Sequence, residues 1–420
     1  MSGLRLWETV PEHWRVLRNR LVFRERNERD CVELPLVAVS QKHGVMGKRE
    51  LEAMEGRKLS GENDDLSNYK RVEPGDIVYN KMRMWQGAVG VSGLRGIASP
   101  AYVVATPLQG LDSRFAAYLL KSVPYVFQSG LFSYGICDDQ NSLRWEDFAN
   151  LETPIPPEGE QTRIANFLDE QTARIDALIA EKERLSELLG EHRSSLITAE
   201  VTGKEAPYDT IPLKRLIKSI ESGVSVNAID VPVENSDIGV LKTSCVYSGV
   251  FDSLQNKAVI PEELGRVSCP VQANTLIVSR MNTPDLVGAA GFCGKDEPNL
   301  YLPDRLWQVR FYEEKCYPRF IYWWTHTVLY RDQVKGACAG TSSSMQNLDQ
   351  ESFRSFVVPL PPLDVQRCIS DSISCEAARI DGLREACVEG VRALREYRSS
   401  LISAAVTGQL NVDSFGREVA

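Results

Sequence analysis

One stretch of sequence decides the fold because it occurs twice: residues 193–203 read RSSLITAEVTG, and residues 398–408 read RSSLISAAVTG. With an offset of 205 positions, the match extends without a gap from Arg114 to Gly203. The chain therefore consists of two similar halves that present two similar surfaces. This arrangement favours a ligand or partner that is itself two-fold, and DNA with two half-sites is one such ligand.

Each copy contains a long segment with helical spacing, 158–199 in the first and 363–404 in the second. A Pro-Pro pair precedes each segment, which stops a strand and permits a helix start, and Thr-Gly follows each, which suits a helix C-cap. Apolar residues recur in steps of three and four, the heptad period of a coiled coil. We expect these residues to pair the helices or to dock partners: Ile164, Leu168, Ile175, Leu178, Leu189, Leu196, Ile369, Ile380, Leu383, Leu394 and Leu401.

The two stripes predict that the helices pack against each other, and the globular segment between them makes antiparallel packing easy. About 35 residues between the outer apolar positions correspond to roughly 50 Å of rod at 1.5 Å per residue. The second stripe is weaker, because Gly390 lowers helix propensity and leaves a gap. In the alternative interpretation, each helix packs on its own domain.

The segments before the two helices are rich in β-branched and aromatic runs bounded by Gly, Pro, Asn and Asp. In the first half we predict strands and then a helix, near 35–39, 77–82, 88–91, 101–106 and 113–121. In the second half the corresponding predictions are 239–243, 275–280, 289–292, 307–311 and the helix 318–327.

The predicted fold class is α/β (α+β), with two mixed domains separated by two long antiparallel coiled-coil helices in a pseudo-two-fold repeat. The expected domains are 1–157, the first spacer helix 158–207, the second globular domain 208–362, and 363–420 with the second spacer helix and the tail.

Composition describes an ordinary globular protein, since 43% of the 420 residues are hydrophobic and 25% are charged. No run of 18 apolar residues occurs and the start lacks a signal-peptide core, so we expect a cytoplasmic protein. The ten cysteines form no C-x-x-C pair, and none of the four histidines lies near a cysteine at ligand spacing. The sequence therefore predicts reduced thiols and no zinc site.

The formal net charge of −9 comes mostly from segment 158–207, which has 11 acidic and 6 basic residues. The globular segments are close to neutral, so DNA affinity would depend on local basic patches. Side chains that pair with bases or phosphates lie at strand ends and in small polar loops. The candidate DNA-binding residues are Lys42, His43, Lys48, Arg49, Lys81, Arg83, Gln86, Lys242, Arg280, Asn282, Thr341 and Ser342. Turn chemistry alone would also explain the Gly, Ser and Asn residues of these loops.

Motifs for catalysis are missing from the sequence. There is no G-x-x-x-x-G-K-[ST] phosphate loop, no Asn/Asp-Pro-Pro-aromatic motif of amino-methyltransferases and no G-x-S-x-G elbow. The nearest approach to a catalytic pattern is Pro303-Asp304 with Glu313 and Lys315, which mimics the Mg²⁺ site of many nucleases. The simpler interpretation of these residues is an Asp at a strand edge followed by a charged turn.

Several features in their order along the chain resemble the DNA-specificity subunits of Type I restriction–modification systems. His13-Trp14 opens the first half, a Gly75–Val78 strand follows, and Pro154–Pro157 with Gln161 leads into the long helix that RSSLI and VTG close. All but the opening recur in the second half. There, Val365-Gln366 stands where the first half has the Glu160-Gln161 pair, and no Trp stands at the start.

This resemblance implies two target-recognition domains, each reading one part of a split DNA sequence, and paired helices that dock two methyltransferase (modification) subunits. Restriction subunits would join the complex through those partners. It also implies that the chain itself is not an enzyme and holds no cofactor, and that S-adenosylmethionine, ATP and Mg²⁺ serve the partner subunits. Half-sites one DNA turn apart, roughly 34–36 Å, need a rigid spacer of comparable reach.

Two alternatives come from other functional classes. One is a stand-alone metal-dependent nuclease that uses Asp304, Glu313 and Lys315. The other is a protein-binding scaffold whose helices bind proteins without DNA contact.

Overall fold

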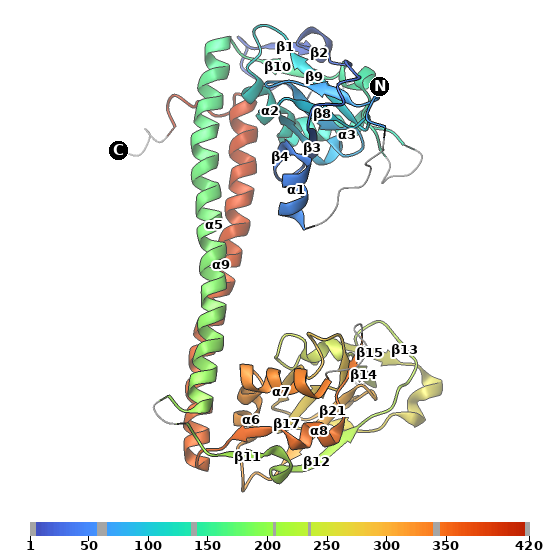
Figure 1. Ribbon diagram of the computed structural model, residues 1–420, viewed down its shortest axis with the longest axis vertical. Coiled ribbons are helices and arrows are strands. Elements are labelled where there is room, and N and C mark those ends of the chain that lie inside the picture. Colours follow the sequence, from blue (N-terminus) through green and yellow to red (C-terminus); the bar gives the residue numbers. More distant parts are fainter. Residues whose placement is uncertain are drawn as a thin grey trace. The chain divides into compact units, whose positions relative to one another are not determined.

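The computed structural model describes residues 6–56, 65–135, 141–204, 207–233, 237–338 and 345–415. The chain divides into two compact units (Figure 1). Unit 1 consists of residues 1–182 and 389–420, and unit 2 consists of residues 183–388. Each unit therefore combines one globular segment with a part of both long helices.

Unit 1 contains two four-stranded sheets. The first has the order β2-β9-β6-β7 and consists of β2 (Phe23–Glu25), β6 (Ile77–Asn80), β7 (Val89–Val91) and β9 (Tyr102–Pro107). The second has the order β4-β3-β8-β5 and consists of β3 (Leu36–Ser40), β4 (Gly44–Gly47), β5 (Lys70–Val72) and β8 (Gly96–Ala98). Strands β3 and β8 run parallel, and the other pairs in these sheets are antiparallel.

Strand β6 lies between two cores, which explains its uninterrupted apolar sequence. Ile77 and Tyr79 are fully buried in the core that contains α2 (Ser113–Lys121) and α3 (Val123–Leu131). Val78 points to the opposite side and joins the smaller core between the sheets. This alternation follows from the two-residue period of a strand. The remaining elements of unit 1 are α1 (Lys48–Glu55), α4 (Trp145–Phe148) and the antiparallel pair β1 (Arg15–Arg18) and β10 (Glu152–Ile155).

Unit 2 repeats this plan. Its first sheet, β12-β21-β17-β19, consists of β12 (Ile217–Ser222), β17 (Thr275–Ser279), β19 (Ala290–Cys293) and β21 (Leu306–Phe311). Its second sheet, β13-β15-β14-β20-β16, consists of β13 (Ala228–Ile229), β14 (Gly239–Leu241), β15 (Asn256–Val259), β16 (Pro270–Val271) and β20 (Glu297–Tyr301). The parallel pair β14–β20 corresponds to β3–β8. The internal repeat is therefore a repeat of topology as well as of sequence.

Among the other elements of unit 2, one strand pair also has a counterpart in unit 1. Strands β11 (Thr210–Pro212) and β23 (Val357–Pro359) pair as β1 and β10 do, and β18 (Met281–Asn282) pairs with β22 (Gln346–Asn347). The helices are α6 (Pro318–Trp324), α7 (Val328–Cys338) and α8 (Gln350–Ser355). The predicted globular strands and helices correspond to β3, β6, β7, β9, α2, β14, β17, β19, β21 and α6.

The two long helices, α5 (Glu158–Thr202) and α9 (Leu363–Val406), pack against each other as predicted, and they run antiparallel (Figure 1). In unit 1 the Arg398 guanidinium binds the Asp176 carboxylate at 2.8 Å, and in unit 2 Arg193 binds Asp381 at 3.1 Å. The two ion pairs are equivalent, because Asp176 and Arg193 lie 205 positions before Asp381 and Arg398. The contacts between the helices therefore repeat in the same way as the sequence. Both helices are followed by a glycine with positive φ, Gly203 and Gly408, as the Thr-Gly motif predicted.

The repeated sequence at 193–203 and 398–408 forms the C-terminal ends of the two long helices. Each end packs in the core of the other half. Ile197 and Val201, at the end of α5, are fully buried in the core of unit 2. Ile402 and Val406, at the end of α9, are buried in the core of unit 1. Each fully buried aliphatic side chain stabilises its unit by roughly 1.5–3 kcal/mol. The two halves of the sequence thus complete each other's cores.

The repeated glutamine after each Pro-Pro pair has a structural role. The Oε1 atom of Gln161 accepts a hydrogen bond from the Asp112 backbone N–H at 2.8 Å, and its Nε2 donates to the Pro156 carbonyl at 2.9 Å. Gln366 makes the equivalent bonds, to the Tyr317 N–H and the Pro361 carbonyl, both at 2.8 Å. Both side chains are 1% exposed. Each glutamine therefore joins the start of a long helix to the loop before α2 or α6.

The predicted pairing stripe needs one correction. Leu178 and Leu383 are 47% and 45% exposed, so neither fills the seam between the helices. An α-helix has 3.6 residues per turn, and a strict heptad stripe therefore drifts around a straight helix. The gap expected at Gly390 is occupied, because the Lys182 side chain lies 3.2 Å from the place of a β-carbon at residue 390.

The other predicted pairing residues lie inward to different degrees. Ile164, Leu168, Ile175, Ile369, Ile380 and Leu401 are buried, and Leu189, Leu196 and Leu394 are half-buried. The exposed Leu178 and Leu383 remain candidates for partner docking. In the described parts of the chain, no helix is long and apolar enough to cross a membrane.

Candidate nucleic-acid interface

The loop after β6 presents the clearest basic surface of unit 1. The Lys81 backbone N–H donates to the Ala101 carbonyl, and the Lys81 carbonyl accepts from the Leu143 N–H, so the backbone holds this position firmly. Arg83 is exposed, and Lys81 is half-buried. Neither side chain has an ion-pair partner among the described residues. Burial, together with the nearby cations Lys70 and Arg144, lowers the pKa of Lys81.

A second part of this surface comes from residues that the sequence analysis missed. The Arg144 guanidinium lies 5.6 Å from the centre of the Tyr134 ring, and both side chains are exposed. Within the described residues Arg144 also lacks a carboxylate partner. An exposed ring beside unpaired cations can contact both bases and phosphates. Only the fold brings Arg144 close to Lys81, because 63 residues of sequence separate them.

The loop between β3 and β4 carries Lys42 and His43, which are both exposed. Their backbone N–H groups donate to Ser40 Oγ at 3.2 and 3.4 Å, which shapes the loop. The structure brings these two residues together with Gln86 in the lining of a cavity of about 1120 Å³. Three of the predicted DNA contacts, from two distant parts of the sequence, are therefore neighbours.

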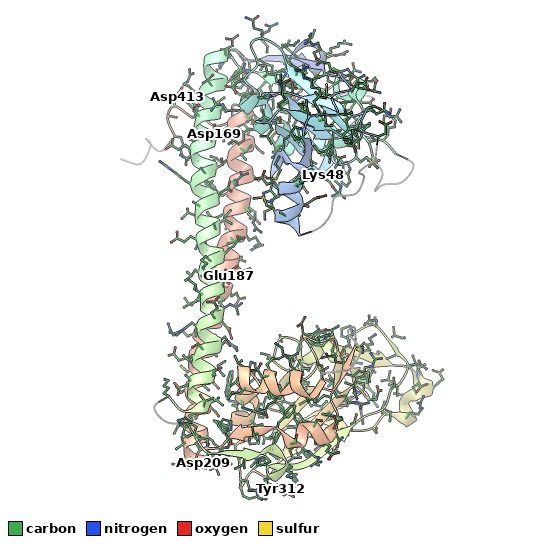
Figure 2. All side chains as sticks on the ribbon, viewed as in Figure 1. Lys48, Asp169, Glu187, Asp209, Tyr312 and Asp413 are labelled. Carbon is green, nitrogen blue, oxygen red and sulfur yellow. The ribbon has the colours of Figure 1, made fainter. Side chains whose placement is uncertain are left out.

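Two further predicted contacts lie at the start of α1. Lys48, which Figure 2 labels, is only 9% exposed, and Arg49 is exposed. The predicted contacts Thr341 and Ser342 lie outside the described residues.

In unit 2 the equivalent basic side chains are engaged within the protein. Arg280 occupies the place of Lys81, because its N–H donates to the Arg305 carbonyl and its own carbonyl accepts from the Leu348 N–H. Its Nε donates to the Asp304 carbonyl at 2.7 Å. Asn282 is 7% exposed and donates to Tyr247 Oη at 2.8 Å.

Lys242 of unit 2 also has a partner, since its ammonium group pairs with the Asp230 carboxylate at 2.5 Å. The exposed Arg305 has no ion-pair partner in the part of the chain that the structure describes. It is a cation that the sequence analysis did not single out.

The residues of the nuclease-like pattern are far apart. Asp304 precedes β21, and Glu313 and Lys315 follow it, so the whole strand separates the two carboxylates. Six strand residues span roughly 20 Å at about 3.3 Å per residue. Two ligands of one Mg²⁺ ion must both lie about 2 Å from it. The described residues also contain no group of three or more His, Cys, Asp or Glu side chains that could hold a metal ion.

The cysteines agree with the prediction of reduced thiols as far as they are described. Cys245, Cys293 and Cys316 are free and buried. Burial raises the pKa of the Cys293 thiol to about 11 and that of Cys316 to about 12. These groups stay protonated at neutral pH, and they are therefore poor nucleophiles and poor metal ligands.

Comparison with known proteins points to one class. The chain is 24% identical over 357 residues to the EcoKI specificity subunit of the Type I restriction enzyme of Escherichia coli (strain K12), a match that covers 81% of this chain and 76% of that protein. It is 25% identical over 159 residues to the EcoEI specificity subunit of Escherichia coli, which covers 38% of this chain and 27% of the relative. No family model matches the sequence.

Solved structures share the fold. A chain from a study of the assembly and conformational transition of the type I R-M system superposes with a TM-score of 0.75 at 14% identity, covering 96% of this chain and all of the other. The HsdS subunit from Thermoanaerobacter tengcongensis gives a TM-score of 0.56 at 15% identity, with 96% and 98% covered. These matches confirm the family resemblance and the duplicated α/β architecture inferred from the sequence.

Proposed function

We propose that this chain is the DNA-recognition subunit of a Type I restriction–modification complex. Each globular segment reads one part of a split DNA target, and the paired helices dock two methyltransferase subunits, through which restriction subunits join. In this role the chain is a cytoplasmic protein and not an enzyme. S-adenosylmethionine, ATP and Mg²⁺ act in the partner subunits.

One observation carries the proposal: two copies of the same buried framework support different surface residues. The framework includes Gln161 and Gln366, which make equivalent hydrogen bonds. The surface differs at equivalent places, since Lys81 has no ion-pair partner among the described residues and Arg280 donates to a carbonyl. A protein that reads two different half-sites needs this combination of a constant support and variable contacts. The similarity to specificity subunits over most of the chain supports the same function.

The decisive experiment is methylation mapping. The chain is coexpressed with a methyltransferase subunit of a Type I system, and methylated positions in the host DNA are mapped by sequencing. We expect a split target with unspecified bases between its two parts. Methylation without this chain, or at sites of no common sequence, would contradict the proposal.

A second experiment asks whether the helices set the spacing of the half-sites. Four residues, about 6 Å or one helical turn, are inserted into α5. The half-sites should stay the same while the number of bases between them changes. Altered half-sites with an unchanged spacer would refute this part of the proposal.

The two alternatives predict different results with the purified chain. A nuclease would cleave DNA in the presence of Mg²⁺ and lose that activity in Asp304→Ala. A pure protein scaffold would retain no DNA on a filter, with or without the methyltransferase. Binding that weakens as salt concentration rises would instead indicate phosphate contacts.

A further inference from the structure

The cavity of unit 1 lies where the globular segment meets α9. Its walls come from the β3–β4 loop, residues 85–91, α2, α3 and the last turns of α9, with Asp169 from α5. Figure 1 shows α2 and β4 beside α9, and Figure 2 labels Asp169 on the neighbouring helix. The volume of about 1120 Å³ is slightly larger than the usual range for small-molecule sites, roughly 300–1,000 Å³.

The lining is strongly cationic. It contains one carboxylate, Asp169, against five permanently or normally charged cations: Lys42, Arg114, Lys121, Arg395 and Arg398. Arg114 binds Asp169 at 2.8 Å, and Arg398 binds Asp176 at 2.8 Å.

Two of these cations are left without a counter-charge. Neither Lys42 nor Lys121 has an ion-pair partner within the described ranges. Burial, and secondly the charge of Arg398, lowers the pKa of Lys121. An anion in the cavity would offset the cost of holding this ammonium group away from water.

The remaining wall is aromatic and apolar. Trp85, Tyr118 and Phe127 line the cavity, and Phe127 is 50% exposed. The Tyr118 hydroxyl donates to Asp169 at 2.8 Å, which orients its ring. Glycines at residues 44, 87, 90 and 130 form part of the lining. The cavity thus offers ring surfaces beside unpaired cations.

The equivalent place in unit 2 is filled by the protein's own side chains. Gly44 has φ +71° and faces Lys121, and Gly249 likewise has φ +78° and faces His326. The surroundings of the two glycines are therefore equivalent in the two units. At an offset of 205 positions, Tyr322 is equivalent to Ala117, and His326 is equivalent to Lys121. The Tyr322 and His326 ring centres lie 4.7 Å apart.

Two neighbouring rings complete this filling. Phe292 corresponds to Val91, because Val91 pairs with Ile77 of β6 and Phe292 pairs with Leu276, the equivalent residue of β17. The ring centres of Phe292 and Tyr322 lie 6.1 Å apart. Trp323 corresponds to Tyr118 and packs 5.4 Å from His326. Among the described residues at these equivalent positions, rings of unit 2 therefore occupy the place that is an open cationic cavity in unit 1.

We propose that the cavity of unit 1 binds one nucleotide unit per chain, an aromatic base joined to phosphate. The cations Lys42 and Lys121 bind the phosphate, and Trp85 and Phe127 contact the base. A partner subunit present in two copies would need the same surface on both halves, and the filled position in unit 2 does not provide it. The nucleotide unit can come from a free nucleotide or from a DNA strand, since both have this chemistry.

The test measures binding of labelled ATP to the purified full chain by equilibrium dialysis. Adenosine contains the base without phosphate, and inorganic triphosphate contains the phosphates without the base. Both should bind more weakly than ATP. Lys121→Met removes the unpaired cation and should weaken ATP binding about tenfold or more, the size expected for a lost charged hydrogen bond. Ala117→Tyr places the ring of the second half in the cavity and should weaken ATP binding by occupying part of it.

Lys214→Met is the matched control, because it removes an exposed lysine of unit 2 that has no ion-pair partner among the described residues, and it should change ATP affinity less than about twofold. Circular dichroism of every variant shows whether it folds.

Competition identifies the source of the nucleotide. If duplex DNA or a short oligonucleotide displaces ATP, the cavity takes a nucleotide of a DNA strand; if it does not, the ligand is a free nucleotide. The proposal is overturned if neither ATP nor oligonucleotide binds at about 1 mM, or if Ala117→Tyr binds as well as the natural chain. Methylation mapping with the same chain distinguishes this failure from failure of the proposed DNA recognition, because mapping does not depend on ATP binding to this chain.

Discussion

The two halves of this protein agree in what they bury and differ in what they expose. Gln161 and Gln366 are equally buried and make the same pair of hydrogen bonds. At the surface, Lys81 lacks an ion-pair partner among the described residues, whereas its counterpart Arg280 donates to a carbonyl. The comparison teaches that a sequence repeat locates the framework of both halves but not their functional contacts. Those contacts have to be found in each half separately.

The largest expected effect tests the exchange of helix ends. Ile197→Ala should destabilise unit 2 by about 2–5 kcal/mol, although residue 197 follows the first globular segment, because its side chain is fully buried in the core of unit 2. Ile402→Ala should destabilise unit 1 by a similar amount. Hydrogen exchange should accelerate in β17 and β21 for the first variant and in β6 and β9 for the second.

Ser195→Ala serves as the control for this pair, since Ser195 is exposed on the same helix and its loss should cost less than about 0.5 kcal/mol. Faster exchange in β6 and β9 of Ile197→Ala would show that each helix end supports its own half instead.

The next prediction concerns the pH dependence of stability. It depends on His326, which occupies the position in the second half that Lys121 occupies in the first. Burial is the main factor that lowers the pKa of His326, to about 4 from 6.5. The unfolded chain then binds this proton more readily than the folded one, so stability falls as pH drops from 6.5 towards 4. Between pH 7 and pH 5 the loss should be about 2 kcal/mol.

Urea denaturation at the two pH values measures this loss. His326→Phe should remove most of the pH dependence, and His192→Gln should retain it, because His192 is exposed. If the His326→Phe chain loses as much stability at pH 5 as the natural chain, another group is responsible.

DNA affinity can be compared between the loop of unit 1 that carries Lys81 and Arg83 and the equivalent loop of unit 2 that carries Arg280. Lys81→Gln and Arg83→Gln should each weaken binding by about fivefold and reduce the salt dependence by about one ion, as expected for lost phosphate contacts. Arg280→Gln should leave the salt dependence unchanged, because its guanidinium is occupied by the Asp304 carbonyl. Filter binding with the methyltransferase partner at several salt concentrations provides the measurement. Equal salt effects in both halves would mean that the engaged Arg280 reaches DNA after all.

The smallest effect concerns the two ion pairs between the long helices. Asp176→Arg alone should destabilise unit 1 by less than about 1 kcal/mol, since Asp176 is half exposed, and adding Arg398→Asp should restore the loss. The same exchange at Arg193 and Asp381 should act on unit 2. A double-mutant cycle measures the coupling in each unit. No recovery in the reversed pairs would show that they do not stabilise the helix register.

The long helices were predictable because strong local signals mark both ends. The Pro-Pro pairs and Thr-Gly motifs place α5 and α9 within a few residues of their observed bounds. The exact seam was not predictable, since the exposure of Leu178 depends on how a 3.6-residue period drifts along a particular neighbour. Much of the second sheet in each unit was also missed, because three-residue strands such as β5 and β8 show no periodic pattern.

The candidate interface was predictable only in part. Strand ends and small loops pointed to Lys42 and Gln86, and the structure places both in one cavity. Nothing local distinguished Lys81 from Arg280, because a bond to the Asp304 carbonyl depends on tertiary structure. Arg144 was missed for the same reason, since its nearness to Lys81 arises from folding alone.

The position of Gly408 has a consequence for how the polypeptide could be rearranged. This residue ends α9 against Pro11 and Trp14, and Gln409 Nε2 donates to Thr9 Oγ1 at 3.3 Å, so the beginning and the end of the described chain meet. A short peptide could join them, and new termini could be opened after Gly203. The second globular segment would then be synthesised first, yet every buried contact described above could form. Gene fusions and permuted libraries could therefore start from either half.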